Sequence, residues 1–206
     1  MQALFIHGMC RTPLSGWRLV RRLKAGGIDA GTFGYATAVR DFSHISKRLA
    51  SRIALLASNG DYILIGHSLG GVLLRAAQAL LPTGTRRPVR VFLVGSPTRS
   101  VRLARLFRRN PVFRAITGDC GQLLASDERM SNVAPVMVPT TAIFGVRGVP
   151  VTFRAFHGEP NDGIVAVSEA SARWIADQVQ VPVEHWFLPA SRRIADIILE
   201  RMGEHA

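Results

Sequence analysis

The chain has 206 residues, 48% of them hydrophobic and 19% charged, and a formal net charge of +12 at pH 7. Such a composition supports a buried core and excludes global disorder, and the length fits one domain spanning residues 1–206. There is no apolar run of the roughly 18–20 residues that a membrane span needs, nor a recognisable secretory signal, so we expect a cytoplasmic protein.

Short apolar runs alternate with amphipathic segments along the chain, which is typical of βαβ units in a parallel sheet. We expect about six strands, at residues 2–6, 31–35, 62–65, 89–94, 140–145 and 183–187. Flanking helices are expected at residues 13–25, 41–58, 69–81 and 190–202. The apolar side chains expected to face the core from the first helix are Leu14, Trp17, Val20 and Leu23. The predicted fold class is α/β, a mostly parallel sheet flanked by helices.

Residues 98–138 interrupt this alternation between the fourth and fifth strands. They contain a basic amphipathic piece at 101–109, then Asn110 and Pro111, and a second helical pattern near 122–129. We interpret this segment as a small, cap-like helical insertion over one end of the sheet rather than as a separate domain.

The segment Gly66-His67-Ser68-Leu69-Gly70 fits the pattern G-x-S-x-G and lies between a predicted strand and a predicted helix. In that context a sharp strand-to-helix turn exposes a nucleophilic serine above the sheet. Glycine suits positions 66 and 70 because a Cβ there would collide with neighbouring backbone. An ordinary serine turn is the alternative, whereas a phosphate-binding loop is disfavoured because no Gly-Lys-Ser/Thr follows.

Two backbone N–H groups are candidates for holding an oxyanion beside Ser68. One belongs to Leu69, which follows the serine and begins the helix, whose N-terminus adds positive potential. The other belongs to Met9, because the first predicted strand ends at His7 and Gly8 and Met9 starts the loop after it. A tight strand exit without a catalytic role is the alternative for this segment.

A nucleophilic serine needs a general base, which in this kind of fold follows both the serine and the acid in the chain. His157, His185 and His205 come after Ser68. His157 precedes the preferred acid, and His205 lies in the tail, where we expect it to be solvated. His185 lies at the end of the last predicted strand and is the preferred base.

The preferred acid is Asp162, in the segment Asn161-Asp162-Gly163 after the fifth predicted strand. A glycine after the aspartate suits a turn that presents its carboxylate. Glu159 is the rival acid, and an aspartate that bonds only its own backbone in an Asx turn is the structural alternative.

These segments resemble the small bacterial α/β-hydrolases of the esterase/lipase type, a group often described as acetyltransferases or hydrolases. The similarity runs nearly from end to end. The matching segments are residues 5–8, 65–71, 95–97 and 160–165, together with His185. The group often has Gly-Thr-Pro where this chain has Gly95-Ser96-Pro97, and the insertion is too short for the full lid of larger lipases.

The resemblance implies Ser68 as nucleophile, Asp162 as acid, His185 as base, and Met9 and Leu69 as oxyanion donors, which agrees with the roles reached from chain order. The expected reaction is hydrolysis of a small-molecule carboxylic ester, with a short to medium acyl group, through an acyl-enzyme. An acyltransferase or thioesterase would use the same residues, and a hydrolase fold can also be a non-catalytic binding module.

The remaining features concern the acyl pocket and the partners. The candidate pocket residues, for which ordinary core is the alternative, are Phe107, Phe113, Leu123 and Trp186. The pI of about 11.4 is typical of proteins that bind nucleic acid or anionic surfaces, but without a nucleic-acid motif we expect no nucleic-acid partner. The arginine-rich residues 99–114 could contact an anionic membrane face or an acidic substrate, with a solvated surface as the alternative.

Cysteine usage points away from a disulfide framework. Cys10 and Cys120 make only one pair, and we expect both to be free thiols. Since no metal-ligand spacing occurs either, we expect no metal and no cofactor.

Overall fold

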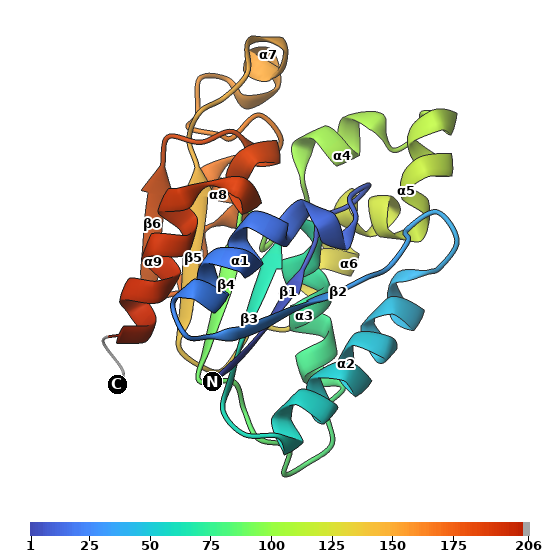
Figure 1. Cartoon of the computed structure of the whole chain (residues 1–206). Coiled ribbons are helices and arrows are strands. Elements are labelled where there is room, and N and C mark those ends of the chain that lie inside the picture. Colours follow the sequence, from blue (N-terminus) through green and yellow to red (C-terminus); the bar gives the residue numbers. More distant parts are fainter. Residues whose placement is uncertain (204–206) are drawn as a thin grey trace.

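The computed structural model describes residues 1–203, with the side chains of residues 151, 153 and 154 left aside, so the candidate base His205 lies outside the described residues. Six strands of this part form one sheet in the order β2-β1-β3-β4-β5-β6 (Figure 1). They are β1 (Gln2–Ile6), β2 (Asp29–Phe33), β3 (Tyr62–His67), β4 (Arg90–Val94), β5 (Thr140–Gly145) and β6 (Asp177–Val181). Every neighbouring pair is parallel, so all six carboxyl ends meet at one edge.

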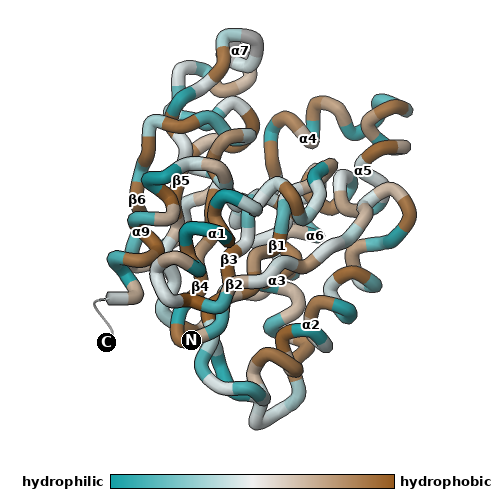
Figure 2. Tube along the Cα trace, in the orientation of Figure 1, coloured by the Kyte–Doolittle hydropathy of each residue, from teal (hydrophilic) through white to brown (hydrophobic). Residues whose placement is uncertain are grey.

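Helices cover both faces of the sheet. One face packs on α1 (Trp17–Ala25) and α9 (Arg192–Gly203), and the other on α2 (Phe42–Ser58) and α3 (Leu69–Ala79). Teal and brown stretches alternate along α2 in Figure 2, as expected of a helix with one buried side. Because both faces of the sheet are buried, the central strands are continuous apolar runs.

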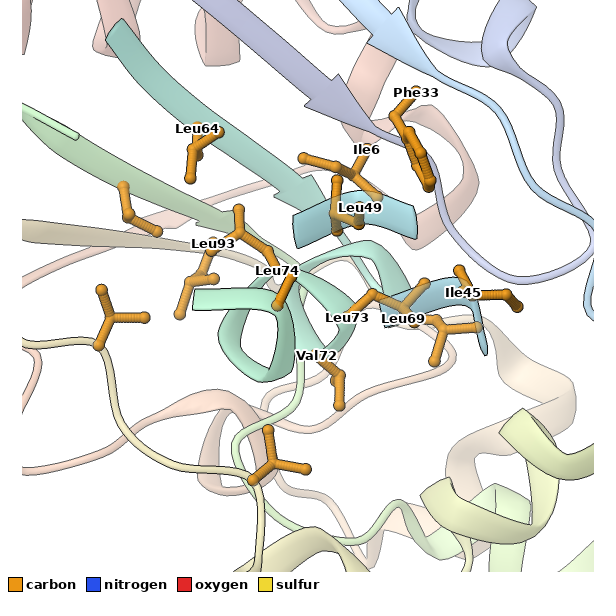
Figure 3. Close-up of a cluster of buried hydrophobic side chains, with 14 of the residues drawn as sticks. Ile6, Phe33, Ile45, Leu49, Leu64, Leu69, Val72, Leu73, Leu74 and Leu93 are labelled. Carbon is orange, nitrogen blue, oxygen red and sulfur yellow. The ribbon is translucent and has the colours of Figure 1, made fainter. Parts of the chain in front are cut away.

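Side chains alternate between two cores on either side of the sheet. Along β1, Leu4 and Ile6 join the core under α2 and α3, whereas Ala3 and Phe5 join the core under α1 and α9. Figure 3 shows the first of these cores, in which strand residues such as Ile6 lie against Leu49 of α2. The two cores hold the strand ends in register, and those ends carry the candidate site.

The predicted insertion is confirmed between β4 and β5. It contains α4 (Arg102–Phe107), α5 (Pro111–Leu124) and α6 (Asp127–Ser131), which lie beside the carboxyl edge of the sheet (Figure 1). The prediction placed its second helix near 122–129, but α5 begins eleven residues earlier, at Pro111. Asn110 caps α5 by accepting hydrogen bonds from Val112 N and Phe113 N, and proline in the first turn fits the same start. Gly118, at φ 55°, kinks the helix, and the kink interrupts the regular apolar spacing from which the length of α5 would be predicted.

The predicted last strand is wrong. The sixth strand is β6 at Asp177–Val181, and residues 183–187 run into the 3-10 helix η3 (His185–Ala190) instead. β6 is an edge strand with alternating burial, and its polar first residue Asp177 is satisfied by Thr141 Oγ1 and Arg201 Nε. Because polar residues alternate along β6, this strand does not form the apolar run by which the other strands were predicted. Strand β2 also begins two residues earlier than predicted.

The predicted inward face of the first helix is confirmed at Val20 and Leu23 and is wrong at Leu14 and Trp17. Pro13–Gly16 forms the 3-10 turn η1, and α1 starts only at Trp17. Leu14 and Trp17 are 74% and 50% exposed, whereas Leu19 and Leu23 are buried. A spacing of three residues drifts by about 60° per step around an α-helix, whereas the four-residue spacing of Leu19 and Leu23 keeps both on one face.

Three short helices remain. They are η2 (Pro150–Thr152), α7 (Phe153–Phe156) and α8 (Val167–Ala170). Within residues 1–203, no helix is both long enough and apolar enough to cross a membrane.

A buried arginine ties the insertion to the central helix. Arg75 of α3 donates to the carbonyl oxygens of Ala134, Pro97 and Val133, and its guanidinium stacks on Trp174. Burial lowers the pKa of Arg75 to about 10. Because three backbone acceptors depend on this one side chain, it holds the segment that leads into β5 against α3.

We expect Arg75→Ala to lower the free energy of unfolding by about 3 kcal/mol, because the buried carbonyls lose their donors. Arg86→Ala removes an exposed pair with Asp61 and should cost less than about 1 kcal/mol. Urea denaturation of both variants measures the difference, and equal losses would contradict the structural role of Arg75.

Candidate active site

Ser68 stands on a strained turn between β3 and α3. Its backbone has φ 54° and ψ −126°, a combination that residues other than glycine rarely adopt. Its N–H donates to Val94 O at 2.9 Å. The turn needs glycine on both sides, since a Cβ on Gly66 would lie 2.4 Å from Gly71 Cα and one on Gly70 would lie 2.3 Å from Ile6 O. The structure therefore has the strand-turn-helix arrangement that the sequence predicted around Ser68.

Asp162 and His185 form a buried hydrogen-bonded pair. Asp162 Oδ2 lies 2.7 Å from His185 Nδ1, and the two side chains are 2% and 4% exposed. Asp162 Oδ1 accepts from the N–H groups of Ile164 and Val165 at 3.0 and 2.8 Å. Asp162 can therefore both close an Asx turn and orient His185, because Oδ1 bonds the turn and Oδ2 bonds the imidazole. With the proton on Nδ1, the Nε2 of His185 is left as an acceptor.

His185 is anchored beside the serine turn through His67. The two imidazole rings lie 4.9 Å apart, and His67 Nε2 donates to His185 O at 3.1 Å. The loops also meet at Gly95, where an added Cβ would lie 3.2 Å from Asp162 Oδ2 and 3.3 Å from His185 Nδ1. The structure therefore brings Ser68, Asp162 and His185 to the same end of the sheet, from loops after three different strands.

The role of His67 was missed from the sequence, which gave it only as a member of the turn. Burial, and the repulsion that protonation would create with the nearby His185 imidazole, hold the pKa of His67 well below its usual value of 6.5, so this side chain is neutral. No local pattern around residue 67 could reveal the contact, because its partner lies 118 residues away in the chain.

Met9 and Leu69, the two predicted oxyanion donors, both lie beside Ser68. Met9 follows β1 on the loop that lines the same cavity as Ser68. Leu69 is the first residue of α3, where backbone N–H groups lack partners within the helix. A Cβ on Gly8 would lie 3.1 Å from Ser68 Cβ, so the loop packs directly on the serine turn.

The imidazole of His7 fixes the shape of this loop. The ring stacks on Tyr35 at 4.2 Å, and Nδ1 donates to Gly8 O at 2.8 Å. Tyr35 N donates to the Nε2 of His7 and Tyr35 OH to the His7 carbonyl, at 3.4 and 2.7 Å. Burial lowers the pKa of His7, which favours the neutral tautomer that these contacts need.

An apolar cavity of about 620 Å³ opens beside Ser68 under the insertion. Phe107, Phe113 and Trp186 line it, as predicted. Leu123 does not, because it is buried in the core, and its neighbour Leu124 faces the cavity instead. Consecutive residues of a helix point about 100° apart, which is why the sequence identified the correct helix but the wrong leucine.

The rival site residues lie in other arrangements. Glu159 accepts from Arg102 Nη2 at 2.6 Å and from Ser168 N at 2.9 Å. Burial opposes the charged form of Glu159, but the hydrogen bonds from Ser168 and Arg102 outweigh it and lower its pKa. His157 caps the C-terminus of α7 in a left-handed conformation.

Both cysteines are free thiols, as predicted. Cys10 lines the cavity, and burial raises its pKa, which disfavours the thiolate form of this side chain. Cys120 lies on α5 of the insertion and is buried in the core.

A family model described as the alpha/beta hydrolase family matches residues 3–200. The chain belongs to the alpha/beta hydrolase family. The predicted fold and family are thereby confirmed. No curated protein matches the chain.

Solved structures share the fold at low identity. Mature lipase BlEst2 from Bacillus licheniformis gives a TM-score of 0.78 at 16% identity, covering 98% of this chain and 91% of that one. The RedJ thioesterase from the prodiginine pathway of Streptomyces coelicolor gives a TM-score of 0.63 at 15% identity, and the match covers 100% of this chain and 90% of RedJ. Phospholipase PlaB from Legionella pneumophila gives a TM-score of 0.63 at 18% identity, and the match covers 83% of this chain and 46% of PlaB. These likenesses show the fold alone.

The neutral histidines make stability depend on pH. Burial lowers the pKa of His67 and His7 in the folded state, so the unfolded chain binds protons that the folded protein does not. Stability is then constant above the unfolded pKa of about 6.5 and falls below it, by up to about 1.4 kcal/mol per pH unit for each histidine.

We expect the melting temperature of the wild type to drop between about pH 7.5 and about pH 5, and His67→Gln to drop less steeply. Thermal unfolding across that range measures the slopes. His44→Gln, an exposed change on α2, is the matched control and should follow the wild type. A slope for His67→Gln equal to that of the wild type would show that His67 does not carry the effect.

Proposed function

We propose that this protein is a serine hydrolase that cleaves carboxylic esters through an acyl-enzyme. The observation that carries the proposal is the buried pair of Asp162 and His185 at the same sheet edge as the strained Ser68 turn. A nucleophile, a base and an orienting acid in this chain order are what such chemistry requires. The family and the fold support a hydrolase, and the residue assignments are our own proposal.

In the proposed mechanism, Ser68 Oγ attacks the acyl carbonyl carbon and its proton passes to His185 Nε2. Asp162 Oδ2 stabilises the resulting imidazolium, while the two backbone bonds to Oδ1 hold the carboxylate in place. The N–H groups of Met9 and Leu69 stabilise the oxyanion. The alcohol leaves with the proton from His185, and a water molecule then releases the acyl group as a carboxylic acid.

The apolar cavity beside Ser68 is the proposed acyl site. Its lining from the insertion is almost entirely aliphatic and aromatic, and its volume of about 620 Å³ is within the usual range of ligand pockets. We therefore propose acyl chains of medium length as substrates. A thioesterase or acyltransferase would use the same serine and the same acyl site, because only the leaving group or the acceptor differs.

Labelling by a fluorophosphonate probe tests the nucleophile. We expect the wild type to be labelled and to hydrolyse p-nitrophenyl butyrate, and Ser68→Ala to do neither. Asp162→Asn should lose roughly 10³- to 10⁴-fold in kcat, because the imidazole loses the tautomer that Nε2 needs. Ser131→Ala, on the exposed helix α6, is the control and should be labelled like the wild type. Labelling that persists in Ser68→Ala, or a folded wild type without labelling, would refute the proposal.

The acyl site makes a prediction about chain length. Each buried methylene adds about 0.8 kcal/mol, so kcat/KM for p-nitrophenyl esters should rise from acetate through butyrate to octanoate. Ala104 lines the cavity from α4, and Ala104→Phe should lower kcat/KM for octanoate about tenfold more than for acetate by filling the space.

Ala79→Phe, at the exposed end of α3, is the matched control and should leave the chain-length profile as in the wild type. A profile that Ala104→Phe leaves unchanged would place the acyl chain elsewhere.

A further inference from the structure

A basic groove leads away from Ser68 on the side opposite the insertion. Cys10 and Trp186 line both the acyl cavity and a second cavity of about 700 Å³ over η1. A third cavity of about 590 Å³ continues from it along α1, sharing Trp17 and Arg18 with the second. We call the basic side chains of this groove the arginine track: Arg11, Arg18, Arg21, Arg22 and Arg192.

The arginine track is built by segments that are far apart in the sequence. Arg11 follows Met9 in the loop after β1, the next three members of the track lie on α1, and Arg192 begins α9. In Figure 1, α1 and the first turn of α9 lie side by side in front of the sheet. The contacts between α1 and α9 and between α1 and η3 place them together. The groove is therefore a feature of the fold rather than of one basic helix.

Within the described part of the chain, the charges of the arginine track have no counter-ions. Among residues 1–203, none of its five members forms an ion pair, and the linings of the second and third cavities contain no carboxylate. The arginines of the insertion differ, since Arg102 pairs with Glu159 and Glu169 and Arg105 pairs with Asp127. Unpaired like charges repel one another, so a groove that gathers them is matched to an anionic ligand.

Two half-exposed tryptophans accompany the charges. Arg11 lies 5.6 Å over the ring of Trp186 and donates from Nη2 to its carbonyl at 3.3 Å. The Nε of Arg11 is buried and has no hydrogen-bond partner in the described part of the chain. Arg18 lies 5.4 Å over the ring of Trp17. The groove thus offers guanidinium groups for phosphates together with indole faces for a planar ring.

We propose that the arginine track binds the leaving group of the substrate, and that this leaving group is coenzyme A. The inference rests on the proposed function, since the acyl chain occupies the apolar cavity and the leaving group must depart from Ser68 in another direction. Several phosphates match several arginines spread along the groove, whereas one phosphate would engage only the nearest. Coenzyme A carries phosphates and an adenine at the far end of a flexible thiol arm, which suits both guanidinium groups and indole faces.

The chemical step is hydrolysis of a thioester. Ser68 Oγ forms a bond to the thioester carbon, the C–S bond breaks, and the serine proton passes through His185 to the sulfur, which leaves as the free thiol. Water then adds to the acyl carbon and releases a carboxylic acid from Ser68. No oxidation or reduction takes place.

Matched thioesters isolate the contribution of the arginine track. Octanoyl-coenzyme A and octanoyl-N-acetylcysteamine have the same acyl group and the same reacting bond, but only the first carries phosphates. We expect kcat/KM to be about tenfold or more higher for the coenzyme A thioester, and this advantage to shrink as salt screens exposed charges.

Charge removal identifies the residues responsible. Arg18→Gln/Arg21→Gln should lower kcat/KM for octanoyl-coenzyme A about tenfold more than for octanoyl-N-acetylcysteamine. Lys47→Gln/Arg52→Gln removes the same charge from exposed positions of α2, on the opposite face of the sheet, and should keep the wild-type ratio. Equal kcat/KM values for the two thioesters in the wild type would overturn the proposal while leaving the serine hydrolase intact.

Calorimetric titration of coenzyme A into Ser68→Ala tests the groove without catalysis. We expect binding that the double variant Arg18→Gln/Arg21→Gln weakens about tenfold in the same background. Absence of binding would overturn the proposal even if the protein hydrolyses esters. Binding to vesicles that contain a polyphosphorylated inositol lipid, lost in the double variant and unmatched by coenzyme A, would also overturn it and assign the groove to a lipid headgroup.

Discussion

The hydrogen bond between Asp162 Oδ2 and His185 Nδ1 is the interaction on which the rest of the site depends. A carboxylate that is 2% exposed is costly unless its oxygens are satisfied, and here both are. The same pair is tied through the backbone, because His185 N donates to Asp162 O at 2.9 Å. The loops after β5 and β6 are thereby joined, and His67 fastens them to the serine turn.

The strain at Ser68 is supported by the same surroundings. A positive φ at a residue other than glycine costs about 1–3 kcal/mol and persists only where neighbouring structure imposes it. Here β3 and α3 approach so closely that no side chain fits at Gly66, the end of β1 excludes one at Gly70, and Ser68 N is held by Val94 O. The buried sheet therefore determines the position of the serine, whereas the loops determine the position of its partners.

Prediction from sequence succeeded where burial was complete and failed where it was one-sided. β1 and β5 were placed to the residue because each is a nearly continuous buried run. β6 was missed because its alternating burial left polar residues in the pattern, and the first part of α5 was missed because glycines and a proline resemble helix breakers. Ser68, Asp162 and His185 could be chosen from chain order, but the contact of His67 with His185 joins positions that nothing in the sequence relates.

The same limit explains why the positive charge was assigned to the insertion. Residues 99–114 are the densest basic segment in the sequence, but carboxylates of neighbouring helices and of one loop compensate Arg102 and Arg105. The arginines of α1 look in sequence like the solvated side of a helix, and Arg192 is far away in the chain. Only the packing of α1 against α9 gathers them into one groove that leads to Ser68. The insertion thus lines an apolar cavity on one side of Ser68, and α1 and α9 line a cationic groove on the other side.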